Sequence, residues 1–258
     1  MAKSIAVAGK GGTGKSTLAA LLVRRLCDQG RGPVLAVDAD PDANLGRLLG
    51  LPAKHSIGEL REDLLREVRE LPAGLSKPSY VEAGLHQIID EAQGFDLMTM
   101  GRGEGAGCYC YLNSLIRQFT DQLAPSYAWI VIDNEAGLEH LSRRTTRNVD
   151  ILLILVTDNP LSLDSARRIR AITEDLDNRI ERRCLVTNML RPERAERIGA
   201  DLQELVSSGL EILCDLSYEE GLDAIVMEGK PLTQVDGSPL LHCLDKIITE
   251  TGGQHGTA

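Results

Sequence analysis

The feature that most constrains the fold is a glycine-rich segment near the N-terminus, from Gly9 to Ser16. Its glycines, lysine and serine have the spacing G-x-x-x-x-G-K-[S/T] of a phosphate-binding loop. An apolar run over 5–8 precedes the segment and a helical pattern over about 15–29 follows it, which is the setting such a loop requires. A second apolar run over 34–37 completes a strand–helix–strand unit, and this unit predicts a parallel sheet with a right-handed crossover.

Each residue type in this segment has a chemical use at its position. Glycines let consecutive backbone N–H groups face an anion without an obstructing Cβ, and the N-terminus of the following helix adds partial positive charge. Lys15 can reach the β- and γ-phosphates, the Ser16 hydroxyl can bind Mg²⁺, and Thr17 can hold the α-phosphate. The predicted nucleotide-binding residues here are Gly9, Lys10, Gly11, Gly12, Thr13, Gly14, Lys15, Ser16 and Thr17.

Apolar runs alternate with amphipathic helical patterns along most of the remaining chain. Further strands are expected over 95–100, 129–132, 151–156, 184–187 and 211–214. Further helices are expected over 112–123, 161–176, 192–207 and 239–249. The alternation predicts an α/β fold with a doubly wound, mainly parallel sheet flanked by helices. We expect a single domain over 1–250, with 56–93 as an insertion outside the core sheet and 251–258 as a disordered tail.

Charge and hydropathy exclude several classes of function. The chain carries 28 basic and 38 acidic residues, a net charge of −10, so it repels a phosphate backbone and no nucleic-acid partner is expected. The arginine-rich stretch 179–197 also contains glutamates and is interpreted as a solvated helical face. No apolar run approaches the ~20 residues that a bilayer requires, and the N-terminus does not resemble a signal peptide. We therefore expect a cytoplasmic protein with no membrane partner.

The six cysteines are expected to stay reduced in that compartment. Four stand singly and are interpreted as small core residues: Cys27, Cys184, Cys214 and Cys243. Cys108 and Cys110 instead form a C-x-C pair after a glycine-rich loop. Two thiolates supply half of a tetrahedral Zn²⁺ site or half of a square-planar Ni²⁺ or Cu²⁺ site, and a twofold dimer would supply the other half. The alternative is that both are buried structural cysteines.

Acidic residues follow two predicted strands, at the sheet edge where open α/β sheets bind ligands. Asp38 and Asp40 follow the strand over 34–37, and a carboxylate there can order an attacking water or a water on Mg²⁺. Asp133 follows the strand over 129–132 and suits binding of Mg²⁺ itself, while the N–H of Gly137 could sense the γ-phosphate. The alternative for Asp38 and Asp40 is that they form a polar turn, and the alternative for Asp133 is a plain aspartate at the end of a strand.

Lys10 is not required by the spacing of a phosphate loop. The sequence K-G-G-x-G-K-[S/T] at 10–16 resembles the deviant Walker A signature of the SIMIBI-class ATPases. The resemblance implies that Lys10 reaches across a dimer to the partner's nucleotide and counters transition-state charge. It also implies that Asp40 orders the attacking water, and that Asn188 contacts adenine. A protein that recognises guanine needs an acidic residue to accept from the base, and the four residues that begin at Asn188 contain none, so ATP is favoured over GTP. The alternative for Lys10 is a solvated surface lysine, and the alternative for Asn188 is a helix cap.

The chain as a whole resembles the CooC-type ATPases, nickel-insertion accessory proteins of carbon monoxide dehydrogenase. Three segments carry the resemblance: G-K-G-G-T-G-K-S-T at 9–17, C-Y-C at 108–110 and D-N-E-A-G-L-E-H-L-S-R-R-T at 133–145. It implies an ATP-hydrolysing, nucleotide-dependent homodimer that binds ATP or ADP with Mg²⁺ and shares one Ni²⁺, or Zn²⁺, between two C-x-C pairs. The implied client is apo-carbon monoxide dehydrogenase or the related acetyl-CoA synthase. The expected catalytic residues are Lys10, Lys15 and Asp40.

Three other functions stay open on the sequence. A MinD- or ParA-like positioning ATPase would need a membrane or DNA surface, but the last predicted helix carries only Lys246 as a lysine or arginine, so we expect it to pack on the core. An iron–sulfur ATPase of the dinitrogenase-reductase type would use well-separated cysteines, unlike the C-x-C pair. The third alternative is a regulatory ATPase without a metal. His140 is open between a metal ligand, a client contact and a packing residue.

Overall fold

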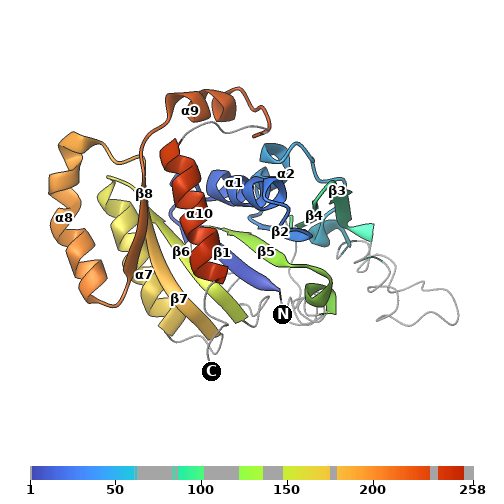
Figure 1. Cartoon of the computed structure of the whole chain (residues 1–258), viewed down its shortest axis with the longest axis horizontal. Coiled ribbons are helices and arrows are strands. Elements are labelled where there is room, and N and C mark those ends of the chain that lie inside the picture. The colour runs from blue at the N-terminus through green and yellow to red at the C-terminus, as the bar shows by residue number, and fades with distance from the viewer. Residues whose placement is uncertain are drawn as a thin grey trace, which may run out of the picture.

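A computed structural model describes residues 2–60, 62, 84, 87–101, 122–135, 148–174, 179–232 and 238–252. The described strands form one eight-stranded sheet in the order β3-β4-β2-β5-β1-β6-β7-β8, with helices on both faces (Figure 1). Neighbouring strands are parallel except β3 and β4, which are antiparallel. This arrangement confirms the predicted fold class.

The bounds of the described elements follow the predicted alternation, while the helix expected over 112–123 lies almost entirely outside the described residues. The strands are β1 (Lys3–Gly9), β2 (Val34–Ala39), β3 (Ile89–Ala92), β4 (Phe95–Thr99), β5 (Trp129–Asn134), β6 (Asn148–Val156), β7 (Arg179–Asn188) and β8 (Glu211–Leu216). The helices are α1 (Lys15–Asp28), α2 (Asn44–Leu48), α7 (Pro160–Glu174), α8 (Pro192–Ser207), α9 (Glu220–Met227) and α10 (Ser238–Gly252), with a short 3₁₀ turn η1 (Ala124–Ser126).

Alternate residues of each central strand face two separate cores. In β1, Ile5 and Val7 pack with α1 and α10, while Ala6 and Ala8 pack in the core that contains residues of α7 and α8. The period of two is that of an extended strand, and burial on both sides explains why these strands are uniformly apolar. The sheet therefore forms a middle layer between two cores, and the carboxyl ends of the parallel strands β1, β2 and β5 share one edge of it.

The segment 56–93 does not stand wholly outside the sheet, so that prediction is wrong in part. Its last residues form β3, which pairs with β4 as an antiparallel edge strand. Ile57, Leu60 and Ile88 are buried in the second core. The sequence of β3, Ile-Asp-Glu-Ala, is short and half acidic, because an edge strand faces solvent and needs no apolar run.

The arginine-rich stretch is also not a helical face at its start, since residues 179–188 form β7. Its arginines alternate between the two faces of the sheet, as strand residues must. Arg182 forms ion pairs with Glu211 in β8 at 2.8 Å and with Glu250 in α10 at 2.9 Å. Arg183 donates hydrogen bonds to Thr173 at the end of α7. Glu211 and Glu250 thus neutralise arginine charge in β7, a strand that is apolar only in its second half.

Helix α10 packs on the core, as predicted, and runs to Gly252, two residues into the expected tail. Its buried residues are Leu240, Cys243, Leu244, Ile247 and Ile248. Polar contacts add to this packing, because the Arg25 guanidinium donates two bonds of 2.7 Å to the Asp245 carboxylate. Among the described helices, none combines the length and apolar character needed to span a bilayer.

Cys214 and Cys243 depart from the predicted state of the cysteines. Both lie in or against the first core, as expected of small core residues, but the structure joins them in a disulfide between β8 and α10, with their Cα atoms 5.8 Å apart. The sequence reading missed this pair because each cysteine stands alone in its own element, 29 residues from the other. Cys27 and Cys184 are free, as expected.

Candidate nucleotide-binding site

The glycine-rich loop connects β1 to α1 and is closed by bonds to one carbonyl. The Lys10 carbonyl accepts from the Thr13 N–H at 3.3 Å, from Thr13 Oγ1 at 2.8 Å and from Lys15 Nζ at 3.4 Å. Gly14 has a φ of +90°, and a Cβ on it would lie 2.5 Å from Nδ2 of Asn188, so only glycine fits there. The loop is thus preformed, and Lys15 is buried at the start of α1.

Asn188, predicted as a base contact, lies at the end of β7 against this loop. Its Nδ2 donates a 2.9 Å hydrogen bond to the Thr13 carbonyl. One half of the amide therefore holds the loop, which leaves Oδ1 as the atom available to a ligand. This second use of Asn188 was not predicted from the sequence, because it depends on a contact across 175 residues.

Two clefts meet at Gly14 and Thr17. The smaller, of about 380 Å³, is lined by Gly14, Thr17, Leu18, Leu21, Asn188, Leu216, Ser217, Glu219, Leu222, Pro239 and Leu240. The larger, of about 900 Å³, is lined by Gly11, Gly12, Gly14, Lys15, Ser16, Thr17, Asp40, Asp42, Asn44, Arg47, Leu48, Val226 and Gly229. The smaller cleft is lined largely by leucine and proline side chains and suits a base, whereas the larger contains the loop together with charged side chains such as Lys15 and Asp40. Together they suit a nucleotide that bridges the two.

Asp38 organises the chain after β2 and is fully buried. One of its oxygens accepts from the Leu45 N–H at 2.9 Å and the other from the Asp40 N–H at 3.2 Å. Burial raises the pKa of Asp38 to about 6, although these bonds act in the opposite direction. The side chain thus supports the loop that carries Asp40, which itself lines the larger cleft.

Asp133 lies beside Asp38 in the sheet, because β2 and β5 pair in register at these two residues. It is fully buried, and neither of its carboxylate oxygens has a hydrogen bond of good geometry. Burial raises its pKa to about 7, while the nearby Ser16 hydroxyl and Lys15 ammonium lower it. An unsatisfied buried carboxylate beside a hydroxyl is costly without a ligand. The pair Ser16 and Asp133 therefore fits Mg²⁺, which prefers such oxygen ligands.

Several predicted residues fall outside the described part of the chain. These are Cys108, Cys110, Gly137 and His140. Within the described residues no group of three or more histidine, cysteine, aspartate or glutamate side chains could hold a metal ion. The predicted Ni²⁺ or Zn²⁺ site at the C-x-C pair stays a prediction.

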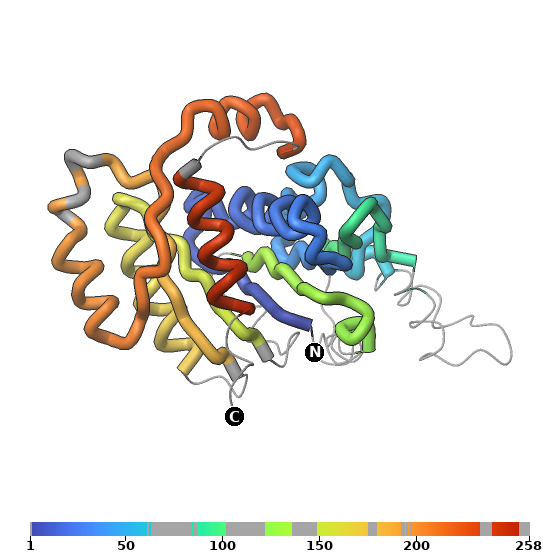
Figure 2. Tube along the Cα trace, in the orientation of Figure 1, coloured from blue at the N-terminus to red at the C-terminus, as the bar shows by residue number. Residues whose placement is uncertain are grey.

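Three residues near the site were not predicted from the sequence. Asn134 follows Asp133 and donates from Nδ2 to the Val7 carbonyl at 3.0 Å, tying β5 to β1 below the loop. Glu219 and Arg47 line the smaller and the larger cleft. Arg47 belongs to α2 and Glu219 to the chain immediately before α9, so no local pattern marks them. Figure 2 shows how the chain passes from β8 through α9 over the upper edge of the sheet.

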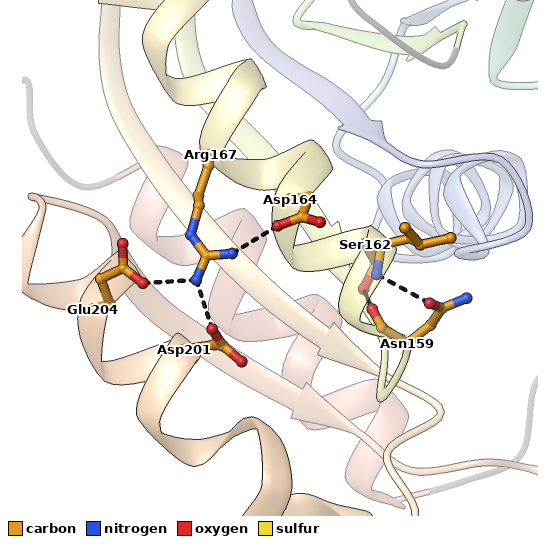
Figure 3. Close-up of polar contacts among 7 residues, drawn as sticks. Asn159, Ser162, Asp164, Arg167, Asp201 and Glu204 are labelled. Atoms are coloured by element: carbon orange, nitrogen blue, oxygen red, sulfur yellow. Dashed lines mark hydrogen bonds and ion pairs between the residues drawn. The ribbon is translucent and has the colours of Figure 1, made fainter.

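The turn after β6 is rigid and lies at the same edge of the sheet. Ser162 Oγ accepts from the Thr157 N–H at 3.0 Å, and the Ser162 N–H donates to the Asn159 carbonyl at 2.8 Å. Figure 3 shows this turn beside an ion-pair group in which Arg167 of α7 contacts Asp164 and crosses to Asp201 and Glu204 of α8. These pairs join the two helices on the face away from α1.

Comparison with known protein families and sequences gives a consistent result. Residues 4–232 match the family described as CobQ/CobB/MinD/ParA nucleotide binding domain. An uncharacterised ATP-binding protein of Methanocaldococcus jannaschii is 40% identical over 230 residues, covering 88% of this chain and 89% of that protein. The carbon monoxide dehydrogenase accessory protein CooC of Rhodospirillum rubrum is 34% identical over 197 residues, covering 72% and 74%.

Solved structures support the same fold. The MinD cell division protein of Aquifex aeolicus superposes with a TM-score of 0.66 at 20% identity, covering 100% of this chain and 98% of that one. At this identity the likeness concerns the fold alone. It confirms the mainly parallel α/β fold.

Proposed function

Because the chain belongs to the CobQ/CobB/MinD/ParA nucleotide-binding family, we propose that it hydrolyses ATP and couples hydrolysis to nickel insertion as a homodimer. The proposed ATP hydrolysis is supported by the preformed loop beside the unsatisfied Asp133 carboxylate. The proposed nickel insertion is supported by the 34% identity to CooC and by the C-x-C pair at 108–110.

In this proposal each part of the larger cleft has one task in phosphoryl transfer. The loop N–H groups and Lys15 bind the β- and γ-phosphates, and Ser16 with Asp133 would hold Mg²⁺. When bound, Mg²⁺ would neutralise charge on the phosphate oxygens. Asp40 accepts a hydrogen bond from the water that attacks the γ-phosphate and so orients it. Lys10, half-buried beside the cleft, stabilises negative charge in the transition state from the partner protomer.

The proposed metal site is shared between two protomers. Cys108 and Cys110 of each copy supply two thiolates, and a twofold axis brings four together around Ni²⁺ or Zn²⁺. Closure of the dimer on ATP would change the spacing between the two pairs and hence the affinity for the metal. The client proposed is apo-carbon monoxide dehydrogenase or a related nickel enzyme such as acetyl-CoA synthase.

The test has one arm for each half of the proposal. Lys15→Ala should abolish phosphate release, whereas Cys108→Ser should leave ATP hydrolysis intact and remove bound Ni²⁺. Cys27→Ser is the matched control, since Cys27 is a free, half-buried cysteine remote from the C-x-C pair in sequence, and it should change neither. Unchanged nickel binding in Cys108→Ser and Cys110→Ser would reject the metallochaperone role. Pelleting with liposomes or DNA would then favour a positioning ATPase.

A further inference from the structure

Arg47 is a cation in the larger cleft that the proposed mechanism does not use. It projects from α2 and lines the cleft together with the loop residues and Asp40. Its side chain is exposed, and within the described part of the chain its guanidinium has no ion pair or hydrogen bond. A free guanidinium beside a phosphate-binding loop has five donors available for an anion.

The backbone that carries Arg47 is firmly held. Leu45 and Leu48 are buried on either side of it in α2. Gly46 lies so close to the neighbouring chain that a Cβ would be 2.7 Å from the Leu51 carbonyl oxygen and 2.8 Å from Leu97 Cδ2. The Leu45 N–H is bonded to Asp38. Arg47 therefore starts from a fixed position next to the loop that carries Asp40.

The end of α9 shapes the space around the guanidinium. Gly229 has a φ of +66°, and a Cβ built on it would overlap Nη2 of Arg47 and lie 2.9 Å from its Cζ. The guanidinium thus lies against the Gly229 backbone, and the missing side chain gives it room. Gly229 lines the same cleft. This contact directs the side chain without occupying its donors.

The acidic side chains around the larger cleft favour an additional cation such as the Arg47 guanidinium. Asp40 and Asp42 line this cleft, and Asp38 and Asp133 lie buried behind it, whereas Lys15 already contacts the Lys10 carbonyl. A polyphosphate would add further negative charge. Arg binds phosphate oxygens through two parallel N–H bonds better than any other side chain. We propose that Arg47 binds a phosphate oxygen of the nucleotide from the α2 wall of the cleft; the inference rests on the proposed nucleotide binding.

The alternative is that Arg47 only joins α2 to α9, and the test separates the two roles. We would measure the Kd of ADP and of a non-hydrolysable ATP analogue, at low and high salt, for wild type, Arg47→Ala and Arg47→Lys. Arg168→Ala is the matched control, because Arg168 is an exposed arginine of α7 outside both clefts. Bonds to charged groups predict a loss of about tenfold or more in Arg47→Ala, with partial recovery in Arg47→Lys and a weaker salt dependence of Kd in Arg47→Ala.

The outcomes are distinguishable. If wild type binds neither nucleotide, the proposed nucleotide binding and this inference both fail. If wild type binds and Arg47→Ala binds within twofold of it, only the inference fails. A loss in Arg47→Ala with a salt dependence equal to that of wild type indicates a purely structural role and also rejects it.

A second variant perturbs the guanidinium without removing its charge. Gly229→Ala should displace it and weaken ADP binding, and the same change should have no further effect in the Arg47→Ala background, as expected for two residues that act through one contact. Equal losses in both backgrounds would contradict the positioning of Arg47 by Gly229.

Discussion

The unsatisfied carboxylate of Asp133 makes a prediction about stability that needs no nucleotide. Burial raises its pKa from 3.8 to about 7, so the folded protein holds a proton that the unfolded chain has lost. Stability is therefore highest below the unfolded pKa and falls as pH rises through the folded pKa. Asp133→Asn removes this titration at nearly constant size. Relative to wild type, the variant should gain stability as the pH increases.

The magnitude follows from the two pKa values. Between pH 5 and pH 8 the titration of one such group changes the free energy of unfolding by about 2 to 3 kcal/mol. The difference between Asp133→Asn and wild type should therefore shift by about that amount across this range. Using a difference between two pH values cancels any fixed cost of burying the new amide.

The assay is denaturant unfolding of both proteins at pH 5 and pH 8, in a chelator and without nucleotide. Asp28→Asn is the control, since Asp28 is exposed at the end of α1, and it should show no such shift. A variant whose stability relative to wild type stays constant with pH would refute the reasoning that burial raises the pKa of Asp133 in the folded protein.

Three further predictions concern other parts of the chain. Lys10→Ala should retain ADP binding but lose ATP-driven dimerisation, and its rate of ATP hydrolysis should fall by about 10³-fold, the scale of a lost arginine finger. Phosphate release measures the rate and light scattering measures the mass. An unchanged rate of hydrolysis would contradict a role of Lys10 in the partner's site. Asn188→Ala should weaken ADP binding because the Thr13 carbonyl loses its 2.9 Å bond; equal Kd values by calorimetry would argue that the loop is held without it. Cys214→Ser should lower the free energy of unfolding under oxidising conditions by about 3 to 4 kcal/mol, because the disulfide no longer restricts the unfolded chain between Cys214 and Cys243. A reductant should remove the difference between variant and wild type. Denaturant unfolding with and without reductant measures both values.

The fold was largely predictable because its signal is local. Uniformly apolar strands and amphipathic helices recur along the chain, and α8 has the bounds that its pattern predicts, 192–207. Among the described strands and α-helices, β3, α2 and α9 were not predicted. β3 is a short acidic edge strand, α2 spans only five residues, and α9 has no fully buried residue, so none of them carries the periodicity of a long core element.

The candidate site was predictable where chemistry follows a strand end. Asp38 and Asp133 were singled out from sequence, and the register of β2 and β5 places them side by side. The contacts that depend on long-range packing were not predictable. Neither the bond from Asn188 to Thr13 nor the approach of Arg47 to Gly229 leaves a pattern in any one segment.

The central claim is that the nucleotide state controls both dimerisation and metal binding. The most direct measurement is the mass and bound Ni²⁺ of reduced protein on one column, with ADP and then with a non-hydrolysable ATP analogue. The account predicts a dimer with the analogue, a change in nickel occupancy between the two nucleotides, and at most one Ni²⁺ per dimer, lost in Cys110→Ser. A nucleotide-driven dimer that binds no nickel, or nickel binding that ignores the nucleotide, would contradict it.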